Sequence, residues 1–570
     1  MALFQHVRDS LHKTFPALAA ASAAVALASC TAAPGPVPSS SAPSAPAPPT
    51  ATGTTTAPAT SSPAPDPGAT PLGWGPQQRD ADKAAAAVAA MTTEQKAGQV
   101  LLPFFKGKDV EAQAALIERL HLAGSIIMGD NVPLDAQGRM DVQGMAAINQ
   151  RLAQAAAAGG RPWPGIIAVD QEGGQVARLG PPLTEWPTPM SYGAAGSAPL
   201  AKDAGQGLAA ELVPLGFNVD FAPDTDVTIG PRDPTIGARS MSSDPGTAAS
   251  LGVAFSQGML AAGVLPAVKH FPGHGSVTVD SHVNLPVQPA PLAELSVRDW
   301  KPFEAAIAAG SPMVMTGHIA VPALEPGVPA SLSGPTYAAL RGLGFKGVAV
   351  TDALNMGAVA KQYPGGTAAV MALAAGADLL LMPADVGQAH AGIVQAVASG
   401  ALPAERLDDA ARRVATMMVW NSRTAAKTGA PAGSGAALSA RISAQAVTVL
   451  TGACSGPLVP GAVQVAGGQP ADRARFEAAA TRAGLALGSG PVVSLIGFGG
   501  RGAGGDIAVA LDAPWPLQDS TAPVKMALYG RSDGAFDALA AVLAGKAPAP
   551  GKLPAAVGGF PAGTGCPSPN

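Results

Sequence analysis

Eight short apolar runs, separated by alanine-rich helical segments, constrain the fold of this chain more than any other feature. Each run is continuously apolar, as expected for a strand that is covered on both faces. Strands that alternate with helices imply a parallel sheet. We therefore predict a (β/α)8 barrel of the TIM type, with a doubly wound open sheet as the alternative. The runs cover residues 99–103, 125–129, 165–170, 219–224, 265–270, 312–317, 347–352 and 378–383.

Ionisable side chains stand at the ends of five of these runs. Barrel enzymes assemble their sites at the carboxyl ends of the strands. Charged groups are also costly to bury unless they have partners, so convergent charges indicate a polar pocket. The sequence therefore predicts an enzyme with its site at one end of the barrel. The residues are Asp170, Asp224, Lys269 with His270, His318 and Asp352.

The first thirty residues have the layout of an export signal. Arg8 and Lys13 precede an apolar stretch that is too short to span a bilayer and ends at Cys30. Residues 27–30, Leu-Ala-Ser-Cys, resemble a bacterial lipobox, in which the cysteine becomes the lipidated first residue. An ordinary signal peptide with an incidental cysteine is the alternative. We expect an exported lipoprotein, anchored in the cell membrane through Cys30 and facing the outside of a bacterium.

Changes in composition set the remaining domain boundaries. A stretch composed almost entirely of Pro, Ser, Ala, Thr and Gly follows the predicted signal. Such a composition cannot form a buried core, so we predict that this stretch is an extended linker. Thr92 and Gln95 have the spacing of a capping box and predict the start of a helix. Four further apolar runs after the barrel predict a smaller α/β domain. The predicted parts are residues 1–30 (signal), 31–76 (linker), 77–425 (barrel), 426–440 (linker) and 441–570 (C-terminal domain).

The net charge bears on the possible binding partners, and the cysteine content bears on possible disulfide bonds. The net charge is −4 and there are no basic runs, so we expect no nucleic-acid partner. Beyond Cys30, only Cys454 and Cys566 remain. In an oxidising exterior these two could pair and clip the C-terminal tail to the second domain. Two unpaired buried thiols are the alternative.

The segment KHFPGHGSVTVDSH, residues 269–282, carries the strongest chemical signal. It starts at a strand end with Lys269 and His270 and continues through a Gly/Pro-containing loop. Side chains two apart in an extended loop point the same way, so Asp280 can bond one nitrogen of His282 while the other faces substrate. Such a histidine is a good general acid/base. A surface loop residue is the alternative, but three of the chain's eight histidines lie in this segment.

Two other regions supply groups that suit carbohydrate chemistry. Asp352 ends a strand, so its carboxylate should project into the barrel mouth as a nucleophile. A helix N-cap is the alternative for this position. Asp170, Arg178 and Arg239 could hydrogen-bond sugar hydroxyls, although each of these signals is weak alone.

Together these segments resemble glycoside hydrolase family 3, and specifically its β-N-acetylglucosaminidase branch, over roughly residues 80–425. KHFPGHG followed by DSH is typical of that branch, whereas β-glucosidases of the family take a glutamate acid/base from elsewhere. The resemblance implies retaining hydrolysis, with Asp352 as nucleophile and His282 as acid/base assisted by Asp280. It also implies an α/β sandwich after the barrel. The implied binding residues for the terminal GlcNAc are Asp170, Arg178, Arg239, Lys269 and His270. We add His318, because the segment VMTGHI (residues 314–319) retains the histidine of the family pattern.

Other functions remain open on the same residues. A GlcNAc phosphorylase is one, because a neutral histidine repels phosphate less than a carboxylate does; a β-glucosidase is another. From a different class comes a catalytically dead, lipid-anchored sugar-binding protein. We expect no cofactor and no metal, because the His and Asp residues lack tight metal-ligand spacing, and we expect a monomer. Peptidoglycan fragments are the expected substrate, with chitin fragments and glycoprotein glycans as alternatives.

Overall fold

The computed structural model describes residues 66–424, 428–502 and 504–567. The predicted signal segment, Cys30 and the predicted linker up to residue 65 lie outside the described residues. Residues 66–76, which the composition assigns to the linker, are folded here. They carry a short 3-10 helix, Pro67–Ala69, and Trp74 is buried in the core of the barrel. The folded part therefore begins before residue 77.

The eight predicted runs form the strands of a closed parallel barrel. Six strands lie side by side in the order β2-β3-β6-β7-β8-β9, and β1 pairs with β10. The Thr351 N–H donates to the Leu379 carbonyl and the Ile126 N–H to the Pro103 carbonyl, each at 3.0 Å, which joins the two groups at both edges. The predicted barrel is confirmed, and the open-sheet alternative is wrong. The strands are β1 (Leu101–Leu102), β2 (Gly124–Ile127), β3 (Ile166–Val169), β6 (Val219–Asp220), β7 (Leu265–Phe271), β8 (Met313–Thr316), β9 (Val348–Thr351) and β10 (Leu380–Leu381).

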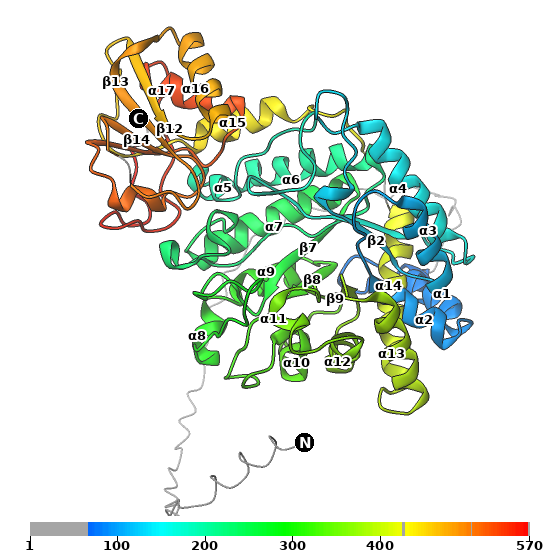
Figure 1. Ribbon diagram of the computed structural model, residues 1–570. Helices are drawn as coiled ribbons and strands as arrows, with labels where there is room; N and C mark the ends of the chain where they lie inside the picture. The colour runs from blue at the N-terminus through cyan, green and yellow to red at the C-terminus, as the bar shows by residue number, and fades with distance from the viewer. Residues whose placement is uncertain (1–65, 425–427, 503, 568–570) are drawn as a thin grey trace, which may run out of the picture. The chain divides into compact units, whose positions relative to one another are not determined.

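Helices surround the strands, as Figure 1 shows around β7, β8 and β9. The predicted capping box starts α2, because Thr92 Oγ1 accepts from the Gln95 N–H and Gln95 Oε1 from the Thr92 N–H. Glycine permits close packing of α6 on α7: a Cβ at Gly258 would lie 2.0 Å from a carbonyl oxygen of α6. The helices are α1 (Gln78–Ala89), α2 (Thr93–Gln99), α3 (Val110–Leu120), α4 (Val142–Ala157), α5 (Met190–Ala195), α6 (Ala198–Leu212), α7 (Pro245–Ala262), α8 (Leu292–Val297), α9 (Lys301–Ala308), α10 (Gly334–Gly342), α11 (Gly357–Ala360), α12 (Thr367–Ala375), α13 (Val386–Ala398) and α14 (Ala404–Thr424). None of the described helices is both long enough and apolar enough to cross a bilayer.

The C-terminal domain is a layered α/β unit built on one five-stranded sheet, drawn in orange and red in Figure 1. In β14, Ile507 and Val509 face the core formed with α16 and α17, whereas Ala508 and Ala510 face a second core that includes Met190 of the barrel. The strand order is β11-β15-β14-β13-β12, and β11 alone runs antiparallel to its neighbour. The elements are α15 (Ala436–Ala446), β11 (Thr448–Thr451), β12 (Ala462–Gly467), α16 (Pro470–Arg482), β13 (Ala486–Ile496), β14 (Ile507–Ala510), β15 (Val524–Ala527) and α17 (Asp533–Leu543).

Two sequence expectations for this domain can be compared with the structure. Helix α15 begins at Ala436, so the latter part of the predicted linker 426–440 is helical. Cys454 and Cys566 form a disulfide, which decides between the two states left open above. The bond joins the start of the domain to the C-terminal tail.

Candidate active site

A cavity of about 390 Å³ opens at the carboxyl ends of the barrel strands. All of the predicted catalytic and binding residues except Asp280 and His318 line it. Enzymes with a TIM-type barrel have their active sites at this end of the barrel. The polar lining residues include Asp170, Glu172, Arg178, Arg239, Lys269, His270, His274, Ser281, His282 and Asp352.

A buried cluster of ion pairs forms one wall of the cavity. Lys269 Nζ lies 3.0 Å from Asp170 Oδ1 and 2.7 Å from Glu172 Oε1. Arg239 Nη2 lies 2.8 Å from the same Glu172 oxygen, and Arg178 Nη2 lies 3.6 Å from Asp170 Oδ2. The cluster presents fixed donors and acceptors to the cavity, which suits recognition of sugar hydroxyls.

Glu172 is the centre of this cluster and was not predicted from the sequence. It lies in β4 (Gln171–Gly173), which pairs with β5 (Val176–Ala177) in a short hairpin. Burial would raise the pKa of Glu172, but the charges of Arg239 and Lys269 hold it well below its usual range. The position two residues after Asp170 in an extended segment was the available signal, because such side chains point to the same face.

Asp352 follows β9 and is almost fully buried at the cavity wall. Its Oδ1 accepts a hydrogen bond from the Ala353 N–H at 2.8 Å. Burial raises the pKa of this carboxyl, but the imidazoles of His318 and His270 together with the Ala353 N–H outweigh that effect and lower it to about 2. Asp352 is therefore ionised over the whole physiological pH range, as a nucleophile must be.

His318 does not lie where we expected it. It is fully buried, and both of its ring nitrogens are bonded within the protein: Nδ1 to Ser331 Oγ at 2.6 Å and Nε2 to the Ala353 carbonyl at 2.9 Å. A ring without a free nitrogen cannot bind a sugar hydroxyl. The predicted substrate-binding role is corrected to a supporting one, in which His318 holds the segment that carries Asp352.

The Asp280–His282 pair has the predicted geometry. Asp280 Oδ1 lies 2.8 Å from His282 Nδ1 and also accepts from the His282 backbone N–H at 2.8 Å. The other ring nitrogen is left for the cavity, which His282 lines. Both side chains are well exposed, at 42% for Asp280 and 63% for His282. A histidine held in this way can take up and release a proton at the rim of the cavity.

Behind the cavity wall, Asp226 connects two buried histidines. Its Oδ2 lies 2.8 Å from His270 Nδ1 and accepts from the His270 N–H at 3.1 Å, while its Oδ1 accepts from the His274 N–H at 2.6 Å. Asp224, Asp226 and His270 lie close enough together to hold a metal ion. However, Arg239 Nη2 already lies 3.2 Å from Asp224 Oδ2, so a metal ion would face a guanidinium. We assign no metal to this cluster.

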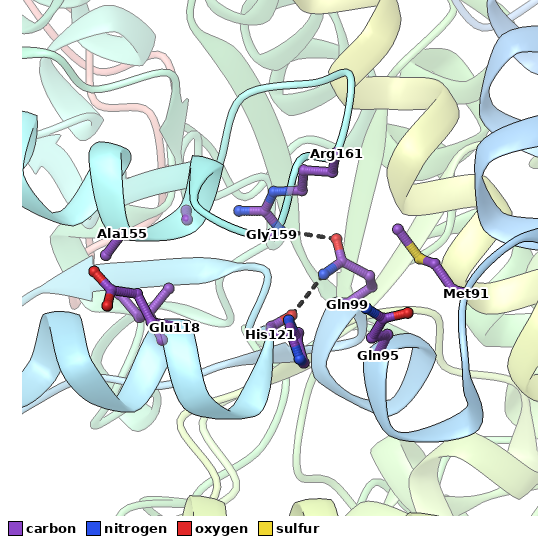
Figure 2. Close-up of a pocket in the computed structure, with 10 residues that line it drawn as sticks. Met91, Gln95, Gln99, Glu118, His121, Ala155, Gly159 and Arg161 are labelled. Carbon is purple, nitrogen blue, oxygen red and sulfur yellow. Dashed lines mark hydrogen bonds between the residues drawn. The ribbon is translucent and has the colours of Figure 1, made fainter.

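A second, much smaller cavity lies at the opposite end of the barrel (Figure 2). Its volume of about 20 Å³ holds no more than a water molecule. Arg161, which precedes β3, bonds Gln99 Oε1 and the Leu122 and Ala123 carbonyls, which precede β1 and β2. These contacts tie together the starts of three strands, which is a structural role and not a catalytic one.

Cleavage of a glycosidic bond requires one group that stabilises or attacks the anomeric carbon and another that protonates the departing oxygen. Asp352 and His282 offer these two capacities at one cavity, beside a cluster suited to polyhydroxylated ligands. The fold and the site together define a glycoside hydrolase. Residues 92–417 match the model of the glycosyl hydrolase family 3 N-terminal domain, and the protein belongs to that family.

Similar proteins are known from several bacteria. Beta-hexosaminidase LpqI of Mycobacterium tuberculosis is 34% identical over 365 residues, which cover 61% of this chain and 88% of that protein. Beta-hexosaminidase A of Pseudoalteromonas piscicida is 34% identical over 379 residues, 59% of this chain but only 62% of that protein. The solved structure of a family 3 β-N-acetylglucosaminidase from Paenibacillus sp. FPU-7 is also similar, with a TM-score of 0.73 and 29% identity. The match covers 82% of this chain and 99% of the Paenibacillus chain.

Proposed function

We propose that this glycoside hydrolase is a retaining β-N-acetylglucosaminidase that releases terminal β-linked GlcNAc. The observation that carries the proposal is the imidazole of His282, held by Asp280 at the cavity that contains the ionised Asp352. The names of the similar proteins, beta-hexosaminidases and a β-N-acetylglucosaminidase, support the same sugar specificity.

The reaction proceeds in two steps. His282 donates a proton to the leaving oxygen while Asp352 attacks the anomeric carbon, which gives a covalent glycosyl-enzyme. His282 then removes a proton from water, and the resulting hydroxide displaces Asp352 from the sugar. The low pKa of Asp352 suits it as attacking and leaving group, and the contact with Asp280 orients the imidazole of His282.

The sugar is held by the ion-pair cluster. Asp170 and Arg178 are only partly buried and can exchange part of their mutual contact for hydroxyl groups of the ligand. Lys269 and Arg239 are more deeply buried and keep their positions through Glu172. The cluster thus fixes the ring while the reacting carbon faces Asp352.

Specificity and acceptor are tested with 4-nitrophenyl β-glycosides. We expect cleavage of the β-GlcNAc derivative and much slower cleavage of the β-glucoside. In phosphate buffer, we expect free GlcNAc and no GlcNAc-1-phosphate. Preferential cleavage of the glucoside, or accumulation of the sugar phosphate, would instead identify a β-glucosidase or a phosphorylase. Absence of turnover on every glycoside would identify a sugar-binding protein.

We further propose that the protein is exported, anchored through lipidated Cys30, and acts as a monomer on peptidoglycan fragments. The export layout of residues 1–30 supports the location, and the Cys454–Cys566 disulfide is typical of an oxidising compartment. Cys30→Ala should move the protein from the membrane fraction to the soluble fraction. Release of GlcNAc from purified muropeptides, compared with chitin oligomers, tests the substrate.

A further inference from the structure

We propose that Ser281 and His274 form a latch that holds the loop carrying the proton-transfer residues, and that this latch is needed to position His282. This inference rests on the proposed function. It concerns the hydroxyl between Asp280 and His282, which has no part in the proton transfer itself. Ser281 is thus a positioning residue that acts through its neighbour.

The latch is the buried point of an otherwise exposed span. From residue 278 to residue 285 the side chains are exposed or half-buried, with the exception of Ser281, which is 1% exposed. Its hydroxyl lies 2.8 Å from His274 Nε2. A serine that is buried between two exposed residues has its side chain turned inward, and this contact gives the reason.

The ends of the loop are fixed independently of the latch. On one side, the Ile229 N–H donates to the Gly275 carbonyl at 2.9 Å, and Val277 is buried. On the other, the Gln288 N–H donates to the Ala320 carbonyl at 2.8 Å. Between these fixed ends, the position of residues 278–285 depends on contacts that the loop itself makes.

His274 offers the hydroxyl a buried and neutral partner. The ring is buried, and burial together with the neighbouring His270 lowers its pKa to about 3, so the imidazole is neutral in the working range. Its backbone N–H is fixed by Asp226. Asp226 also holds His270, which lines the sugar site, so the latch and the sugar site share one support.

Two hydrogen bonds to backbone carbonyls place the latched loop next to the segment that follows Asp352. The Gly357 N–H donates to the His282 carbonyl at 3.3 Å, and Lys361 Nζ donates to the Val283 carbonyl at 3.0 Å. Both donors follow Asp352 in the chain and belong to α11 or its end. Ser281 fixes the loop from one side and α11 fixes it from the other, so His282 is held relative to Asp352.

The test is a double-mutant cycle between the two latch residues. Ser281→Ala should lower kcat on 4-nitrophenyl β-GlcNAc by about fivefold, which corresponds to the loss of one hydrogen bond. KM should change by less than about twofold. In a His274→Leu background, which has no hydrogen-bonding group at this position, Ser281→Ala should have little further effect, because its partner is already lost. Thr278→Ala, which removes a hydroxyl from an exposed position of the same loop, is the matched control and should leave kcat unchanged.

Equal losses from Ser281→Ala in both backgrounds, or a loss confined to KM, would overturn the latch. Amide hydrogen exchange of residues 278–285 gives a readout that needs no activity. We expect faster exchange in Ser281→Ala than in wild type or Thr278→Ala, and equal exchange in all three would also overturn it. If the wild-type protein cleaves no aryl β-GlcNAc, the proposed function fails, and the exchange measurement still decides whether the latch exists.

Discussion

Glu172 shows how strongly one buried residue can determine the site. It is fully buried and lies between the cations Lys269 and Arg239. Glu172→Gln leaves two buried cations short of a counter-charge, which typically costs about 3–5 kcal/mol of unfolding free energy. Urea denaturation measures this loss. Glu185→Gln, which breaks a more exposed pair with Arg475, is the control and should cost less than about 1 kcal/mol. Equal effects would contradict the central position of Glu172.

Asp352 links stability to pH. Its pKa of about 2 in the folded state is below the ordinary aspartate value, so its charge stabilises the fold above about pH 4. This contribution is lost as the pH falls towards 2. Asp352→Asn, which resembles the protonated carboxyl, should lower the free energy of unfolding by about 2 kcal/mol at pH 7 and by less at pH 3. A difference that grows on acidification would contradict the assignment.

The sequence predicted the cavity residues that are proposed to react better than the residues that support them. Asp352 and His282 were recognisable because each follows a distinctive signal, a strand end or a DSH segment. The role of His318 was wrong because a strand-end position does not tell whether a side chain enters the cavity or packs beneath it. Glu172 was missed because its importance depends on Arg239 and Lys269, which are far away in the chain and approach it only after folding.

Among the structural elements, the starts of the first barrel strands depend on one arginine. Burial lowers the pKa of Arg161 to about 10, and no carboxylate partner is found among the described residues. Its guanidinium instead satisfies Gln99 and two backbone carbonyls. Arg161→Met should lower the free energy of unfolding by about 2–3 kcal/mol, because these acceptors lose their donor.

The matched control is Arg151→Met, in helix α4. Arg151 pairs with Glu111 and Glu118 at the surface, so its loss should cost less than about 1 kcal/mol. Neither variant should change kcat per folded molecule, since neither arginine lines the candidate active-site cavity. A selective loss of kcat in Arg161→Met would contradict the structural role.

Strand prediction succeeded where strands are continuously apolar and failed where the pattern is mixed or the strand is very short. All eight barrel strands lie within or beside continuously apolar runs, because both faces of a parallel barrel strand are covered. Strand β12 was missed because its pattern is mixed and partly exposed, whereas β11, the other edge strand of the sheet, is apolar and largely buried. The β4–β5 hairpin is too short and glycine-rich to show periodicity.

At the scale of the whole molecule, the disulfide supports the C-terminal domain. Cys454 and Cys566 are 112 residues apart, and a cross-link over such a distance can stabilise a fold by about 4–5 kcal/mol. Cys454→Ser, or reduction of the bond, should lower the melting temperature of the protein. Cleavage of aryl β-GlcNAc at 25 °C should persist, because the cavity is lined by barrel residues. Unchanged melting after verified reduction would contradict this role.

The two domains also share hydrogen bonds that join barrel to sandwich. The Thr188 N–H donates to the Tyr529 carbonyl at 2.8 Å, and Ser242 Oγ donates to the Pro554 carbonyl at 3.0 Å. Together with the core formed around Met190, these contacts make the described residues one compact unit. Sequence patterns predicted both domains but not these contacts, which depend on residues more than three hundred positions apart.

The central claim is that Asp352 forms the covalent bond to the sugar. Incubation with a 2-fluoro or other slow GlcNAc-type inactivator should trap the glycosyl-enzyme, and peptide mapping by mass spectrometry locates the adduct. We expect one added sugar on the peptide VAVTDALNMG, at Asp352, and none after Asp352→Asn. An adduct on any other side chain would contradict the account.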